Sequence, residues 1–163
     1  MTQRLVPYDI GCEPSPSIPA EMLLQDSREA FLLFFATTRD ITDSGYLGDL
    51  GVAVVECVGW ETTKFGYPND EGLPEHPLYS LGLGDESLVY EVVNSEWALE
   101  VGQQIKESAE RIRDKVEFNR DPPRHFVVLL KEKTFECLAR DIVVNHYAKD
   151  HAAAVSFVHA RFN

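Results

Sequence analysis

The sequence predicts an α+β fold: an antiparallel or mixed β-sheet with one long amphipathic helix (about 95–117) packed on one face, a two-layer sandwich. Short apolar runs rich in β-branched and aromatic residues recur along the chain between turn residues, which is typical of strands. One stretch instead repeats apolar side chains at three- and four-residue steps, which is typical of a helix. Strands that follow one another through short turns favour antiparallel pairing, with the helix as the second layer.

The N-terminal third begins with an arm, because three prolines within residues 1–18 prevent a long regular element. Ser17 and Pro19 suit the start of a helix. The run AFLLFFATT is short and continuously apolar, which favours a strand buried on both faces. The elements expected here are a strand at 4–8, a short helix at about 19–28, and strands at 30–38, 50–60 and 61–67, the last two paired as a hairpin.

The long helix has the strongest pattern in the chain. Its apolar stripe comprises Trp97, Val101, Ile105, Ala109, Ile112 and Val116, Asn94 or Ser95 can cap its start, and 121–123 (Asp-Pro-Pro) prevents its continuation. Short strands are expected at 79–83 and 88–93, and a strand hairpin at 125–130 and 134–144. For 150–163 two alternatives stay open, a helix capped by Asp150 or a strand through 155–157.

Length and composition indicate one domain over 1–163, since 163 residues with 44% hydrophobic side chains can build one core. The formal net charge of −12 disfavours nucleic acid and anionic membrane surfaces as partners. No stretch is apolar enough for a membrane span, and the N-terminus lacks the pattern of a secretory signal. Three widely spaced cysteines fit no disulfide framework, so we expect a cytoplasmic location.

The Pro/Gly-rich segment 65–83 is the first candidate region for a site, because it gathers ionisable residues in a loop. Glu75 and His76 are its candidate catalytic groups, and the candidate binding residues are Tyr67, Asp70, Glu71 and Tyr79. A structural alternative stays open, in which the prolines stiffen an ordered cover over one end of the sheet with Tyr67 and Tyr79 packed beneath it.

His125, at the start of a predicted strand, is the third candidate catalytic residue. If it approaches His76, Cys137 or Glu136 on the neighbouring strand would complete a Cys/His nucleophilic pair or a mixed-ligand metal site. A buried core cysteine and a hydrogen-bonded strand-end histidine are the ordinary alternatives. The chain contains no HExxH, GxGxxG, Walker or GxSxG motif, so its sequence identifies neither a cofactor nor a particular metal.

These observations favour a non-enzymatic domain that binds a partner protein or a small ligand where the Pro/Gly loop meets the sheet. The alternative is a small metal-assisted or acid–base hydrolase that uses the 67–79 loop and His125. A structural subunit of a larger assembly is a third hypothesis, and no pattern specifies the oligomeric state.

Overall fold

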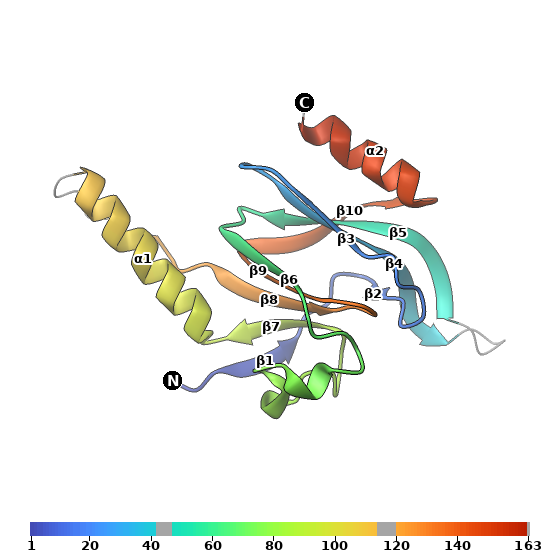
Figure 1. Cartoon of the computed structure of the whole chain (residues 1–163), viewed down its shortest axis with the longest axis horizontal. Coiled ribbons are helices and arrows are strands. Elements are labelled where there is room, and N and C mark those ends of the chain that lie inside the picture. The colour runs from blue at the N-terminus through green and yellow to red at the C-terminus, as the bar shows by residue number, and fades with distance from the viewer. Residues whose placement is uncertain (42–46, 114–119, 163) are drawn as a thin grey trace.

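The computed structural model describes residues 1–41, 47–113 and 120–162, and this part of the chain forms a mixed α/β fold with two antiparallel sheets and two helices (Figure 1). Sheet A has the strand order β1-β7-β8-β9-β6, formed by Arg4–Pro7, Val89–Val93, Arg124–Leu129, Thr134–Ala139 and Thr62–Gly66. Sheet B has the order β10-β5-β4-β2, formed by Asp141–Ala148, Leu47–Val58, Ala30–Ile41 and Glu13–Pro14, and β3 (Met22–Gln25) also pairs with β4.

The two sheets share one apolar core. Strand β4 supplies Leu32 and Phe34 to this core, while β8 and β9 supply Phe126 and Phe135 from sheet A. The alternate side chains of β4 pack on the opposite face of sheet B, so this strand is buried on both faces, as its continuous apolar run predicts.

Each sheet has a different cover on its outer face. The C-terminal helix α2 (His151–Phe162) packs Ala154 and Val158 onto sheet B. The segment 67–88, with the short 3-10 turns η1 (Leu73–Glu75) and η2 (Tyr79–Leu81), covers sheet A and buries Leu78 and Leu83. Of the two alternatives for the C-terminus, the helix is correct, and the Asp150 carboxylate accepts a hydrogen bond from the Ala153 N–H at 2.8 Å as its cap.

Neither the full helix expected at about 95–117 nor its packing across one sheet face in a two-layer sandwich is confirmed. Helix α1 spans Glu96–Arg113, and 114–117 of its expected range lie outside the described residues. Figure 1 shows α1 projecting away from the sheets, joined to them at its N-terminal end. Ala98 is buried, whereas Leu99 and Ile112 are 56% and 76% exposed. The apolar period predicts a helix here, but α2 and the 67–88 segment, and not α1, cover the outer faces of the two sheets.

Four local expectations differ from the structure. The segment expected as a helix at 19–28 contains strand β3, because Met22–Gln25 pairs with β4 and this pairing overrides local propensity. The strand expected at 79–83 is instead the 3-10 turn η2. Strand β6 pairs with β9 and not with β5. The strand expected at 134–144 is divided at Arg140 into β9 in sheet A and β10 in sheet B.

The N-terminal arm, residues 1–18, is incorporated into the fold through two strands. Strand β1 pairs with β7 at the edge of sheet A, and β2 pairs with β4 in sheet B. No helix within the described ranges is both long enough and apolar enough to cross a membrane.

Candidate functional site

The outer face of sheet A brings two of the predicted residues toward one point. In β8, Phe126 and Val128 point into the shared core, so His125 lies on the opposite face with Val127 and Leu129. Strand β9 is registered so that His125 opposes Leu138 and Val127 opposes Glu136. His125 and Glu136 are therefore diagonal neighbours on the face that the 67–88 segment covers.

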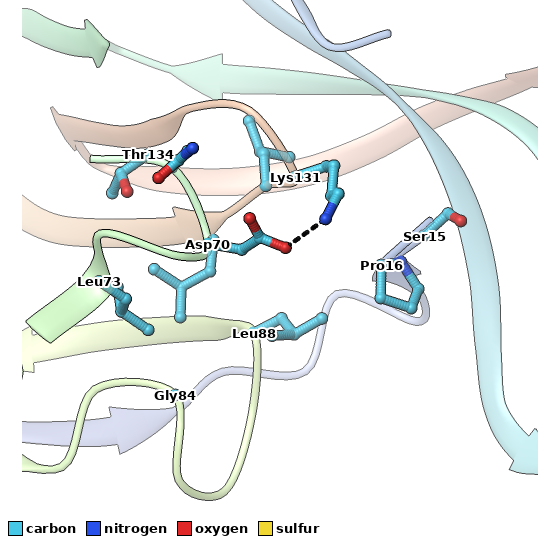
Figure 2. A pocket seen from close by; sticks show the side chains of 11 residues that line it. Ser15, Pro16, Asp70, Leu73, Gly84, Leu88, Lys131 and Thr134 are labelled. Carbon is cyan, nitrogen blue, oxygen red and sulfur yellow. Dashed lines mark hydrogen bonds and ion pairs between the residues drawn. The ribbon is translucent and has the colours of Figure 1, made fainter. Parts of the chain in front are cut away.

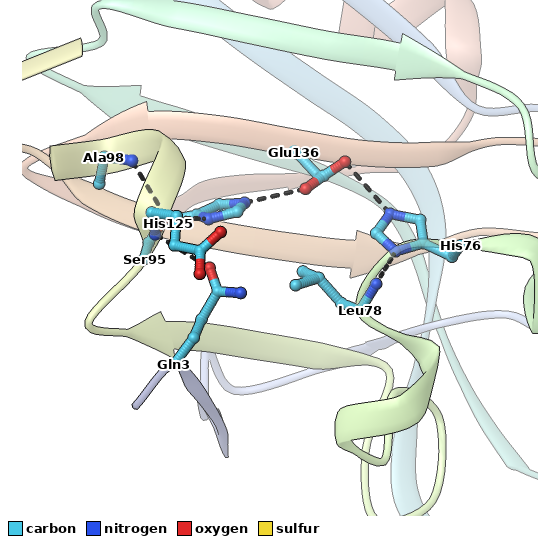
Figure 3. A network of polar contacts seen from close by, with 8 residues as sticks. Gln3, His76, Leu78, Ser95, Ala98, His125 and Glu136 are labelled. Carbon is cyan, nitrogen blue, oxygen red and sulfur yellow. Dashed lines mark hydrogen bonds and ion pairs between the residues drawn. The ribbon is translucent and has the colours of Figure 1, made fainter. Parts of the chain in front are cut away.

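Four side chains form a continuous hydrogen-bonded network there (Figure 3). The two carboxylate oxygens of Glu136 lie 2.9 Å from His125 Nε2 and 3.2 Å from His76 Nε2. The other ring nitrogen of His125, Nδ1, lies 2.7 Å from the Ser95 hydroxyl oxygen. The network is sequestered, since Ser95 and His125 are each 3% exposed and His76 is 6% exposed.

The hydrogen bonds assign the protons. His76 Nδ1 accepts the Leu78 backbone N–H at 3.0 Å, so the proton of this ring lies on Nε2, which donates to Glu136. Burial alone would raise the pKa of Glu136, but the hydrogen bonds from His125 and His76 outweigh burial and lower its pKa from 4.5 to about 2. Glu136 is therefore an ionised acceptor of two imidazole N–H groups.

Ser95 connects this network to helix α1. Asn94 follows β7 and has a φ of 57°, a left-handed conformation that asparagine tolerates, and the chain turns there into the helix. The Ser95 hydroxyl oxygen then accepts the Ala98 N–H at 3.1 Å, which is the hydrogen bond of a helix N-cap. The side chain that begins α1 is thus also the one that contacts His125.

The network borders a pocket of about 170 Å³, which we call the histidine pocket. Trp97 stands edge-on to the His125 ring, with centroids 5.0 Å apart, and the Lys64 ammonium lies 3.9 Å from the centroid of the Trp97 ring. Lys64 thereby places a positive charge at the same pocket as the Glu136 carboxylate. Its full lining is Gln3, Lys64, His76, Pro77, Leu78, Glu96, Trp97, His125 and Glu136.

A second pocket, of about 120 Å³, lies where the Pro/Gly segment meets the end of the β8–β9 hairpin (Figure 2). We call it the leucine pocket, because its lining includes Leu73, Leu88, Leu129 and Leu130. The ion pair between Lys131 Nζ and Asp70 Oδ2, 2.6 Å long, stands at its side. Its remaining lining residues are Ser15, Pro16, Asn69, Gly84 and Thr134.

The predicted catalytic residues are brought together in part. His76 and His125 share Glu136, although 49 positions separate them in the chain. Glu75 is an exposed residue outside the network, and its carboxylate accepts the Tyr67 hydroxyl at 2.7 Å. Glu75 is the last residue of the turn η1 and is exposed, whereas the next residue, His76, is buried.

Of the predicted binding residues, one lines a pocket and the other three are exposed. Asp70 lines the leucine pocket, where the hydrogen bond from Lys131 lowers its pKa. Tyr67 and Tyr79 are 70% and 43% exposed, so neither packs beneath the segment as the structural alternative expects. Glu71 is exposed and lines neither the histidine pocket nor the leucine pocket.

Two further expectations concern cysteine and metal. Cys137 lies on the core face of β9, opposite to Glu136, and the pKa of its thiol is raised by a hydrogen bond with Cys57 and by burial. A Cys/His pair is therefore wrong for Cys137 and His125, which point to opposite faces of sheet A. Within the described ranges, no group of three His, Cys, Asp or Glu side chains is arranged to hold a metal ion.

The sequence pattern identifies Ser95 only as a candidate helix cap and Glu136 only as one of two candidate partners for His125. A signal for both exists in the strand pattern, since Val92 pairs with His125 and places the end of β7 beside the start of β8. Finding it requires the cross-strand register, which a single sequence does not state.

Comparisons of this chain with protein-family models, with curated proteins and with solved structures found no match.

Proposed function

We propose that this protein binds a small, mainly apolar molecule with one polar group in the leucine pocket. The observation that carries the proposal is the composition of this pocket, which combines four leucine side chains with the Asp70–Lys131 ion pair. Concave apolar walls with a few placed polar groups are the usual design of small-ligand sites. This position agrees with the expectation that binding occurs where the Pro/Gly loop meets the sheet.

The volume limits the ligand. An apolar protein cavity of about 150 Å³ accommodates a benzene ring, so about 120 Å³ suits a small ring or a short branched chain. Burying such a group removes apolar surface from water, while Asp70 and Lys131 offer an acceptor and a donor for a polar substituent. A small carboxylic acid or amine with a single ring matches these contacts.

Ligand-observed NMR tests the proposal with a panel of single-ring compounds that carry one carboxylate, amine or hydroxyl. We expect binding to wild type and a loss of at least about tenfold in affinity for Leu88→Trp, which fills the pocket. Leu81→Trp is the matched control, because Leu81 is 37% exposed and lies outside the pocket. Equal binding by both variants, or no binding by folded wild type, would contradict the proposal.

A second candidate function is acid–base hydrolysis with His125 as the base. The observation that favours it is the His125–Glu136 pair at the histidine pocket, because an oriented imidazole beside an ionised carboxylate suits proton transfer. The test is hydrolysis of p-nitrophenyl acetate, which we expect to fall by about 100-fold or more in His125→Gln. Equal rates for wild type, His125→Gln and buffer would remove this candidate.

A further inference from the structure

We propose that the Ser95 hydroxyl is a nucleophile that accepts a small acyl group from a carboxylic ester, with His125 as its base and Glu136 as the group that positions His125. This inference rests on the second candidate function above and names its nucleophile and substrate class. It starts from the proton positions along Ser95, His125 and Glu136.

The direction of each hydrogen bond follows from the ionised Glu136. Its carboxylate only accepts, so His125 Nε2 carries a proton and donates it. In the neutral ring Nδ1 is then an acceptor, and the Ser95 O–H, 2.7 Å away, is its donor. A hydroxyl that donates to an imidazole held by a carboxylate is the arrangement that activates serine nucleophiles.

The lone pairs of Ser95 allow this chemistry. One lone pair of its oxygen accepts the Ala98 N–H, and the second remains available for an acyl carbon. The adjacent Glu96 N–H donates to the Gln3 side chain, whereas the Trp97 N–H has no acceptor among the described residues. The Trp97 N–H, at the positive end of α1, is the candidate donor to a developing oxyanion.

A pocket gives the acyl group a place. Ser95 and His125 also line a space of about 190 Å³ on the side of α1 that faces Pro122 and Pro123, distinct from the leucine pocket. Its wall includes the apolar side chains Val92, Ala98 and Leu99 together with the ion pair of Glu91 and Arg124. This volume and the apolar part of the lining suit a short aliphatic acyl chain.

The proposed reaction transfers the acyl group of the ester to Ser95 and releases the alcohol. Ser95 Oγ bonds to the ester carbonyl carbon while its proton passes to His125 Nδ1, and Glu136 stabilises the resulting imidazolium. The carbon–oxygen bond to the alcohol then breaks, and the leaving alkoxide takes the proton from Nδ1. The products are the alcohol and an acyl ester on Ser95, which water hydrolyses with His125 again as base.

The test is labelling by a fluorophosphonate probe, read by intact mass and by peptide mapping, together with turnover of p-nitrophenyl acetate. We expect a single label on Ser95 that is absent from Ser95→Ala and from Ser95→Gly, and labelling at least about 100-fold slower in His125→Gln. Ser95→Gly guards against misfolding, because glycine is tolerated at an N-cap better than alanine. Ser87→Ala is the matched control, since Ser87 is a buried serine (6% exposed) bonded to Val89 N–H and Glu13.

The outcomes separate the two hypotheses. If His125→Gln loses turnover while Ser95→Gly keeps both turnover and fold, His125 activates water directly, and the nucleophile is overturned while the hydrolase stands. If folded wild type neither labels nor turns over, both are overturned. A label on another residue, or equal labelling of His125→Gln, also overturns the role of Ser95.

Discussion

Glu136 is the residue on which the buried network depends, because it is the only charged group in it that both histidines contact within the described part of the chain. Its side chain is 12% exposed. A carboxylate this buried is stable in the folded state only because each of its oxygens accepts an imidazole N–H. Removing either donor leaves a buried charge partly unpaired, which links the stability of the fold to the chemistry of the site.

We predict that Glu136 makes stability depend on pH in the acid range. Its pKa is lowered in the folded protein from 4.5 to about 2, so protons bind more readily to the unfolded chain. The stabilisation is therefore complete above about pH 5 and is lost as the pH falls toward 2, and its size is at most about 3 kcal/mol. Urea unfolding of wild type and of Glu136→Gln over this range measures it.

Glu136→Gln is the control for this titration, since its side chain has similar volume and no ionisation. We expect its unfolding free energy to change less between about pH 5 and pH 2 than that of wild type. Parallel curves for the two proteins would show that Glu136 contributes nothing to acid denaturation.

At the scale of elements, the two helices have different roles in packing. Helix α2 is a short element whose Val158 is fully buried against sheet B, and the cation of Arg161 near its end pairs with Glu56 of β5 at 2.8 Å. Helix α1 is longer but contacts the sheets through its first turn, where Ser95 and Ala98 are buried. The hydrophobic period alone therefore does not indicate which helix supports the core.

We predict that truncation in α2 destabilises the protein much more than truncation in α1. Val158→Ala removes two methyl groups from a site with 0% exposure and should lower the unfolding free energy by about 2 kcal/mol. Ile112→Ala, at a side chain 76% exposed, should change it by less than about 0.5 kcal/mol. Urea denaturation compares the two variants, and equal effects would contradict the assignment of the covering role to α2.

At the scale of the molecule, both sheets contribute to one interior, and the chain crosses between them at Arg140 without a linker. The N-terminal arm also joins both, since β1 belongs to sheet A and β2 to sheet B. Such interleaving makes independent folding of one sheet unfavourable, because each would expose its half of the common core. We therefore keep the prediction of a single domain over 1–163.

We predict one cooperative unfolding transition. Phe126 of sheet A is fully buried in the shared core, and Phe126→Ala should lower the unfolding free energy by about 3 to 5 kcal/mol. Far-UV circular dichroism and tryptophan fluorescence should report the same midpoint for wild type and, at lower urea, for the variant. Two separated transitions would show that the sheets unfold independently and would contradict the single-domain prediction.

Local sequence patterns predict some elements of this fold, whereas other elements and the site depend on contacts between distant parts of the chain. The strands at 30–38 and 125–130 are predictable because their apolar runs report burial directly. The helix expected at 19–28 fails because pairing of Met22 with Leu33 outweighs local helix signals. His76 and His125 are recognisable as candidates, but their meeting through Glu136 depends on the register of β8 with β9 and on the path of the 67–88 segment.

Strand β4 has a consequence for how the chain reaches its native pairing. Because its side chains enter an apolar interior on either side, sliding the strand by one position would exchange two hydrophobic sets rather than expose one. The turn that precedes it, where the Asp26 carboxylate accepts the N–H groups of Arg28 and Glu29, then helps to fix the alignment of β3 with β4. A small surface turn thereby favours one of two registers of a strand that is apolar on both faces, and errors in strand pairing should originate there.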